Sequence, residues 1–230
     1  MATSTRQVIL DRIRSATHDG SSIAYDSLPR PYIRRGTLSP EAKAELMAKR
    51  LREYDAEVVE CVPVDVAAAV ASQLAVSGKR VFTAPQGLPS AWLAQGFIWL
   101  VDNHLDYSEI EGVEGVVTAA SAGIADSGTI VLHHGAEEGR RVLSLLPDWH
   151  LCILFASQIV ETLPEYFDLF AHPPALATYI SGPSATADIE MTRIKGVHGP
   201  RFLNVVLVHD AMQSATGASQ NSGAAQAGIP

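Results

Sequence analysis

The chain has 230 residues, 47% of them hydrophobic and 18% charged, a composition that excludes an intrinsically disordered protein and suits one large domain. A formal net charge of −8 at pH 7 argues against a nucleic-acid partner, because phosphate binding depends on clustered Lys and Arg. The apolar runs are all too short to span a membrane, so we expect a soluble protein.

Residues 1–38 are predicted to form a helix followed by a loop. Val8, Ile9 and Ile13 recur at helical spacing, and a stretch rich in Gly, Ser and Pro follows them. The segment from Met1 to Ser15 carries charges throughout and lacks the apolar core of a signal peptide, so we expect a cytoplasmic protein. We interpret the helix as an appendage to the main domain.

Residues 39–210 are expected to form an α/β domain, and the Ala-, Gly-, Ser- and Gln-rich residues 211–230 a disordered tail. Ser39 with Pro40 and Glu41 is a typical helix start. Beyond this helix, strand and helix patterns alternate, which predicts parallel βαβ units in one sheet with helices on both faces. The strands are expected at residues 56–62, 79–85 and 97–103, and the helices between them at residues 64–76 and 87–96.

A sheet of this kind has its ligand crevice at the carboxyl ends of its strands. Gln86, Asp102 and His104 stand at the ends of two of the predicted strands and would open onto that crevice. We interpret them as ordinary loop residues, with ligand contacts as the alternative.

The stretch from Val113 to His134 has the pattern of two strands joined by a turn, which residues 126–129 would form. The same residue types suit a structural hairpin and a ligand-binding turn, and the pattern leaves both open. As strand neighbours, His133 and His134 would face opposite sides, so we predict no metal site from this pair.

Two adjacent arginines, Arg140 and Arg141, precede an apolar run that Ser144 interrupts. Arg141 can hold a carboxylate with two hydrogen bonds. His150 stands at the start of the next predicted strand and would transfer protons near neutral pH. After that strand, an amphipathic helix is expected at residues 157–170.

Turn-forming and polar residues crowd between two further predicted strands, in the segment Ser181–Arg201. Gly182 and Pro183 would end the first of these strands, and Ser184 would then stand at a short helical turn that favours an anion. A capped turn with solvated charges would use the same residue types, so the pattern alone does not establish a ligand site.

Three ionisable residues of this segment, Asp188, Glu190 and His198, are candidates for catalysis. The two carboxylates share one face in an extended stretch and point apart on a helix, and their spacing fits either. His198 has a side chain that titrates near neutral pH and stands beside Gly199, whose backbone can approach a neighbour closely. Arg201 is a possible partner for a carboxylate or a phosphate.

The chain contains, in order, IADSGTIVL (Ile124–Leu132), RRVLSLLPDWH (Arg140–His150) and SGPSATADIEMTRIKGVHGPR (Ser181–Arg201). These three motifs in this order resemble the LUD-domain proteins of the lactate utilisation protein C family. The resemblance implies an α/β fold with a three-layer, open and mostly parallel sheet, similar to the sugar-phosphate isomerase and CoA-transferase-like (NagB/RpiA-like) group. It also implies a role in oxidising L-lactate to pyruvate beside iron–sulfur partner proteins.

Together with the residue patterns, the resemblance places the candidate residues at one strand-end crevice that binds an organic acid or a nucleotide-like ligand. The catalytic candidates are Asp188, Glu190 and His198. The ligand-binding candidates are Asp126, Ser127, Gly128, Thr129, Arg141, Ser144, His150, Gly182, Ser184, Gly199 and Arg201, and no metal ligands are expected.

Cys61 and Cys152 are far apart and form no CxxC pair, so any iron–sulfur centre would belong to a partner protein. The chain also lacks GxGxxG, Walker and GxSxG motifs. We therefore expect a component of a lactate-oxidising assembly that binds no cofactor itself. The alternatives are a free-standing transferase or ligase resembling CoA transferases or formyltetrahydrofolate cyclo-ligase, and a scaffold with a vestigial pocket.

Overall fold

The computed structural model describes residues 4–17, 27–172, 174–186, 194–196 and 199–210. The chain divides into two compact units, Met1–Tyr32 and Ile33–Pro230. Helix α1 (Thr5–Thr17) lies in the first unit and buries none of its side chains. Among the described residues, no helix combines the length and the apolarity that a membrane crossing requires.

The second unit is built on a six-stranded sheet in which all neighbouring strands are parallel. This confirms the predicted α/β fold with a mostly parallel sheet. In spatial order the strands are β1 (Glu57–Cys61), β12 (Phe202–Val208), β7 (Trp149–Phe155), β4 (Gly115–Ala119), β2 (Val81–Pro85) and β3 (Ile98–Asp102).

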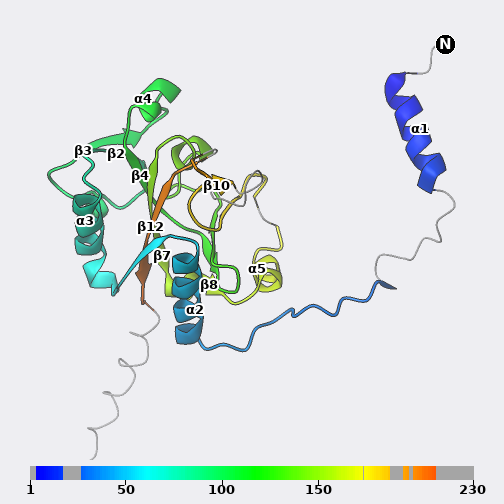
Figure 1. Ribbon diagram of the computed structural model, residues 1–230, viewed down its shortest axis with the longest axis horizontal. Coiled ribbons are helices and arrows are strands. Elements are labelled where there is room, and N and C mark those ends of the chain that lie inside the picture. The colour runs from blue at the N-terminus through cyan, green and yellow to red at the C-terminus, as the bar shows by residue number, and fades with distance from the viewer. Residues whose placement is uncertain (1–3, 18–26, 173, 187–193, 197–198, 211–230) are drawn as a thin grey trace, which may run out of the picture. The chain divides into compact units, whose positions relative to one another are not determined.

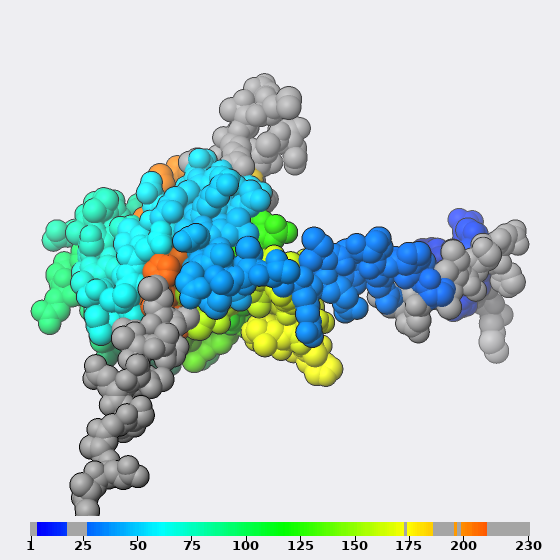
Figure 2. Space-filling view, turned by 90° about the horizontal axis from the view of Figure 1, so that it is seen from below, coloured from blue at the N-terminus to red at the C-terminus, as the bar shows by residue number. Residues whose placement is uncertain are grey.

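Two helices lie on opposite sides of this sheet, α2 (Pro40–Glu53) and α3 (Val66–Val76), as Figure 1 shows. The side of α2 that points away from the sheet forms part of the molecular surface (Figure 2). Strand β7 alternates between the two layers: Leu151 and Ile153 pack in the cluster that contains α3, whereas Cys152 and Leu154 pack in the cluster that contains α2. The period of two is that of a strand buried on both faces.

A second, four-stranded sheet shares the layer of α2. Its order is β8-β5-β6-β9, with β6 antiparallel to β5 and to β9. Its members are β8 (Ile159–Val160), β5 (Ala122–Ile124), β6 (Thr129–Leu132) and β9 (Thr178–Ile180).

The stretch from Val113 to His134 therefore forms three strands, and the prediction of two strands was wrong. The chain leaves the large sheet after Ala119 and enters the second sheet at Ala122. Both strands are buried along their whole length. The pattern of apolar residues therefore does not show where the strand of the first sheet ends and the strand of the second sheet begins.

Short elements account for the other differences from the sequence pattern. Residues 87–96 form only the 3₁₀ turn η3 (Ser90–Trp92), and the expected helical turn near Ser184 is instead a two-stranded ribbon. The pattern also gave no sign of α4 (Tyr107–Glu111). The remaining elements are η2 (Pro63–Asp65), η4 (Arg141–Ser144), η5 (Ala156–Gln158), α5 (Leu163–Leu169), β10 (Ala185–Thr186) and β11 (Ile194–Lys195).

The helix expected at residues 157–170 begins only at Leu163, because Thr162 and Glu165 form a capping box. The Thr162 hydroxyl accepts the Glu165 backbone N–H at 3.4 Å, and the Glu165 carboxylate accepts the Thr162 backbone N–H at 2.9 Å. This reciprocal arrangement satisfies backbone donors that have no partner inside the helix. The signature T-x-x-E is in the sequence and marks the true start.

We predict that Thr162→Ala lowers the free energy of unfolding by about 1 kcal/mol, the usual cost of losing a side-chain cap. Urea denaturation monitored by circular dichroism measures it. The matched control is Thr162→Ser, which keeps the hydroxyl and should stay within a few tenths of a kcal/mol of the unaltered protein. Equal stability of the Ala variant and the unaltered protein would show that the cap contributes nothing.

Candidate functional site

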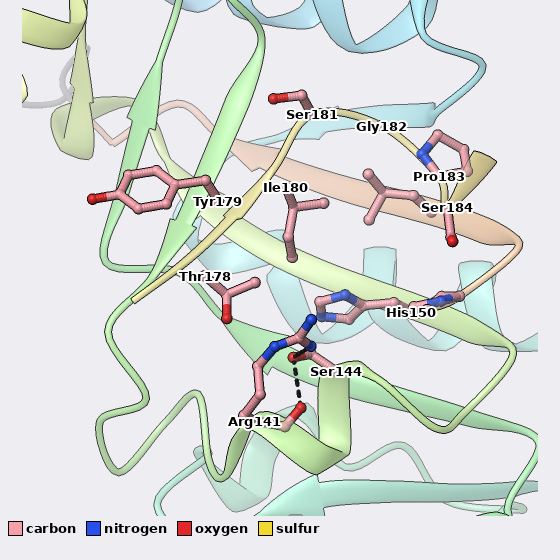
Figure 3. Close-up of a pocket in the computed structure, with 13 residues that line it drawn as sticks. Arg141, Ser144, His150, Thr178, Tyr179, Ile180, Ser181, Gly182, Pro183 and Ser184 are labelled. Atoms are coloured by element: carbon pink, nitrogen blue, oxygen red, sulfur yellow. Dashed lines mark hydrogen bonds between the residues drawn. The ribbon is translucent and has the colours of Figure 1, made fainter. Parts of the chain in front are cut away.

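A small cavity of about 180 Å³ lies between η4, strands β7, β9 and β12, and the segment that follows β9. We call it the Arg141 cavity. His150 and Leu203 are the second residues of β7 and β12, so the cavity lies at the amino-terminal ends of these strands. The lining residues, shown in Figure 3, are Arg141, Ser144, His150, Thr178, Tyr179, Ile180, Ser181, Gly182, Pro183, Ser184, Gly199, Pro200 and Leu203.

Arg141 supplies the positive charge of the cavity and is held in place by Ser144. Its Nη1 donates to Ser144 Oγ at 3.1 Å, and the buried Ser144 hydroxyl donates back to the Arg141 carbonyl oxygen at 3.2 Å. In the part of the chain that the structure describes, no carboxylate forms an ion pair with Arg141. The guanidinium is therefore positioned to accept an anionic ligand.

His150 forms the inner wall and is 1% exposed. Its Nε2 is 2.8 Å from Thr118 Oγ1, the hydroxyl of a buried residue on β4. Burial, with a smaller contribution from the charge of Arg141, lowers the pKa of His150 from 6.5 to about 4. Burial therefore favours the neutral imidazole at neutral pH, and proton transfer by His150 stays a prediction.

A row of hydroxyls connects the predicted turn at residues 126–129 to the Arg141 cavity. Ser127 Oγ is 2.7 Å from Thr129 Oγ1, which is 2.7 Å from Ser181 Oγ. Together with Asp126, these three residues line a neighbouring cavity of about 350 Å³, and Ser181 also lines the Arg141 cavity. Thr129 and Ser181, which are 52 positions apart in the sequence, are thus in contact where the two cavities adjoin.

Two of the candidate glycines have backbone roles. Gly128 has a φ of +62°, and a Cβ there would lie 2.6 Å from Arg50 Cβ of α2. Gly182 has a φ of +97°, and a Cβ there would lie 2.7 Å from Tyr54 Cβ. Both positions need glycine for the left-handed conformation and for the close approach of a neighbour.

The remaining candidates separate into three groups. Ser184 and Gly199 line the Arg141 cavity with Arg141, Ser144, His150 and Gly182. Arg201 lies outside its lining and makes a two-pronged ion pair with Asp148, with Nη2 2.8 Å from Oδ2. The catalytic candidates Asp188, Glu190 and His198 lie outside the described residues.

A second, wider crevice of about 520 Å³ opens at the carboxyl ends of β2 and β3, where the sheet geometry predicted one. Gln86, Asp102 and His104 all line it, together with both arginines of the Arg140–Arg141 pair. Asp102 is buried and accepts hydrogen bonds from Arg140 at 2.8 and 2.6 Å, and this partner lowers the pKa of the Asp102 carboxyl. Arg141 lines both this crevice and the Arg141 cavity.

Sequence reasoning missed several residues that shape the cavity. Thr118 and Ile180 belong to predicted strands, and nothing local distinguishes them from ordinary core positions. Ser181 belongs to the recognised motif Ser181–Arg201, but its residue type alone did not single it out. The pairing of β4 with β7 would have identified Thr118 as a neighbour of His150. In this register Thr118 is opposite Cys152, which is two residues from His150.

The chain resembles known proteins over the region that holds the cavity. A family model described as LUD domain matches residues 101–208. Lactate utilization protein C of Deinococcus radiodurans is 37% identical over 177 residues, which cover 74% of this chain and 82% of that protein. Proteins of the same name from Exiguobacterium sp. and Bacillus subtilis are 36% and 34% identical, over 58% and 54% of this chain and 63% and 55% of their own lengths.

The fold also agrees with that of a solved structure. It is the crystal structure of a duf162 family protein from Deinococcus radiodurans, which superposes with a TM-score of 0.64 at 32% sequence identity. The superposition covers 75% of this chain and 99% of that one. The similarity therefore extends well beyond the three motifs.

The buried imidazole should make the stability of the protein depend on pH between about 4 and 6.5. The unfolded chain binds the His150 proton at the ordinary pKa of 6.5, whereas the folded chain binds it only near 4. Between these values the unfolded state holds more protons, so the free energy of unfolding falls by about 3 kcal/mol as the pH is lowered through this window.

Urea denaturation at a series of pH values measures this dependence. His150→Gln, which cannot take up the proton, should lose most of the slope between pH 4 and 6.5. The exposed His172→Gln serves as the matched control and should keep it. An unchanged slope in the His150→Gln protein would contradict the assignment.

Proposed function

The chain belongs to the LUD-domain family of lactate utilization protein C, and from this premise we propose that it serves lactate utilisation by binding a small organic acid in the Arg141 cavity. The observation that carries the proposal is the Arg141 guanidinium, which faces a small cavity and has no carboxylate partner among the described residues. Arginine matches the planar geometry of a carboxylate with two parallel hydrogen bonds.

The size of the cavity favours a small acid. Its volume of about 180 Å³ lies below the roughly 300–1,000 Å³ of pockets that hold drug-sized ligands. This is the scale of a three-carbon acid and is too small for a drug-sized ligand or a nucleotide.

The cavity is lined by both polar and apolar side chains. Ser144, Ser181 and Ser184 are among its lining residues, and Ile180 and Leu203 supply apolar surface. Figure 3 shows Ile180 across the cavity from the Arg141 guanidinium. A short acid bound with its carboxylate on Arg141 would therefore place its methyl group against apolar side chains.

The redox step of lactate oxidation is proposed to belong to iron–sulfur partner proteins. Burial raises the pKa of the Cys152 thiol to about 12 and also raises the pKa of Cys61, so both thiols keep their protons and are poor cluster ligands at neutral pH. Within the described ranges, no group of three or more His, Cys, Asp or Glu side chains is arranged to hold a metal ion. A subunit that holds the acid beside a partner's cluster fits both observations.

A second function has one specific observation in its favour. The crevice at the carboxyl ends of β2 and β3 holds about 520 Å³ and carries Arg140, fixed by Asp102. That volume suits a nucleotide-like ligand, which a free-standing transferase or ligase resembling CoA transferases or formyltetrahydrofolate cyclo-ligase would need. The two ligands would then share the side chain of Arg141.

The Arg141→Gln protein tests the proposed acid site. A hydrogen bond to a charged group contributes about 1.5–3 kcal/mol, so isothermal titration calorimetry should show L-lactate binding weakened by about tenfold or more. Arg201→Gln is the matched control, because Arg201 is paired with Asp148 outside the cavity, and it should bind L-lactate as the unaltered chain does. L-lactate binding that is the same with and without the Arg141 guanidinium would refute the site.

A further inference from the structure

A chain of hydrogen bonds runs from the wall of the Arg141 cavity into the core of the sheet. His150 Nε2 is 2.8 Å from Thr118 Oγ1, Thr118 Oγ1 is 3.8 Å from Cys152 Sγ, and Cys152 Sγ is 3.7 Å from the carbonyl oxygen of Ala119. Thr118 and Cys152 are fully buried and His150 is 1% exposed. Water therefore does not compete for these bonds.

The chemistry of each group determines which atom donates and which accepts in this series of hydrogen bonds. The Ala119 carbonyl only accepts, so the Cys152 S–H donates to it and leaves sulfur lone pairs for Thr118. Burial raises the pKa of Cys152 to about 12, which keeps the proton on the thiol at neutral pH. Thr118 then gives its single hydroxyl proton to Cys152 Sγ, and its oxygen accepts a proton from His150 Nε2.

This direction favours one tautomer of His150. With a pKa of about 4 the ring is neutral at pH 7 and carries one N–H proton. The series of hydrogen bonds through Thr118 and Cys152 places that proton on Nε2. Nδ1 is left with a lone pair, and the described residues offer it no hydrogen-bond partner. Figure 3 shows the guanidinium of Arg141 beside the His150 ring.

We propose that His150 Nδ1 is a fixed hydrogen-bond acceptor that makes the Arg141 cavity selective for 2-hydroxy acids over the corresponding 2-keto acids. This inference rests on the proposed function, because it concerns an acid already held by Arg141.

The geometry of the acid explains the selectivity. The hydroxyl of a 2-hydroxy acid is on the carbon next to the carboxylate, so an acid bound to Arg141 brings that hydroxyl to the adjacent wall, where His150 lies. A hydroxyl donates a hydrogen bond to Nδ1. A keto oxygen in the same place only accepts, so two lone pairs face each other and Nδ1 stays without a partner. A binding site in which the wrong ligand leaves a buried polar group without a hydrogen bond binds that ligand about tenfold or more weakly than the right one.

Calorimetric titration of the unaltered chain with L-lactate and with pyruvate at pH 7 tests the inference. The expected result is lactate binding tighter than pyruvate binding by about tenfold or more. Pyruvate binding as tightly as lactate would overturn the inference and leave the proposed acid site standing. Failure of both acids to bind would overturn the proposed function and the inference together.

Thr118→Val tests the origin of the selectivity, because it removes the acceptor of the Nε2 proton while preserving the shape of the side chain. Its expected effect is to bring the two affinities to within about threefold of each other, since the ring can then place its proton on Nδ1 and donate to a keto oxygen. The matched control is Thr83→Val, another buried sheet threonine, whose hydroxyl donates to the Leu100 carbonyl away from the cavity; it should keep the preference for lactate. A Thr118→Val protein that keeps the full preference would contradict the inference.

Nitrogen-15 NMR of histidine-labelled, unaltered protein provides a measurement that does not depend on a variant folding. At pH 7 the spectrum should show His150 with a protonated Nε2 and an unprotonated Nδ1. A proton on Nδ1 would overturn the inference.

Discussion

The hydrogen bond between His150 and Thr118 is the interaction on which the site depends. It joins the second residue of β7 to the neighbouring strand β4 inside a parallel sheet, where a polar group without a partner would cost several kcal/mol. The same burial keeps the imidazole neutral, so it adds no second charge beside Arg141. A single positive charge, a hydroxyl-bearing wall and an apolar wall then define what the cavity can accept.

The fold was predictable from the sequence wherever a local pattern determines local structure. The alternation of strand and helix from Glu57 to Asp102 identified the parallel sheet, because strands buried on both faces appear as short apolar runs between helical patterns. The hairpin of β5 and β6 was not separated from β4, since all three strands are buried and apolar throughout. Strands of both sheets pack in the cluster that contains α2, for example Ile130 of β6 and Leu154 of β7, so burial alone does not show which sheet a strand joins.

The candidate site was predictable only in part, for a related reason. Residue type and motif order pointed to Arg141, Ser144 and His150, which do line one cavity. The same reasoning favoured Arg201, yet the register of β12 against β7 places it next to Asp148, which pairs with its charge. Local sequence likewise cannot show that position 150 faces the interior, and that orientation determines whether the imidazole titrates near pH 7 or near 4. The sheet rule located a crevice at the carboxyl ends of the strands, whereas the Arg141 cavity lies at the amino ends of β7 and β12.

A crystal structure of the chain grown with L-lactate tests most directly whether Arg141 and His150 hold the acid. We expect electron density for the acid in the Arg141 cavity, with its carboxylate within hydrogen-bond distance of the Arg141 guanidinium and its hydroxyl at His150 Nδ1. Lactate bound instead in the crevice beside Gln86 and His104, or a cavity that stays without the acid at saturating concentration, would contradict it.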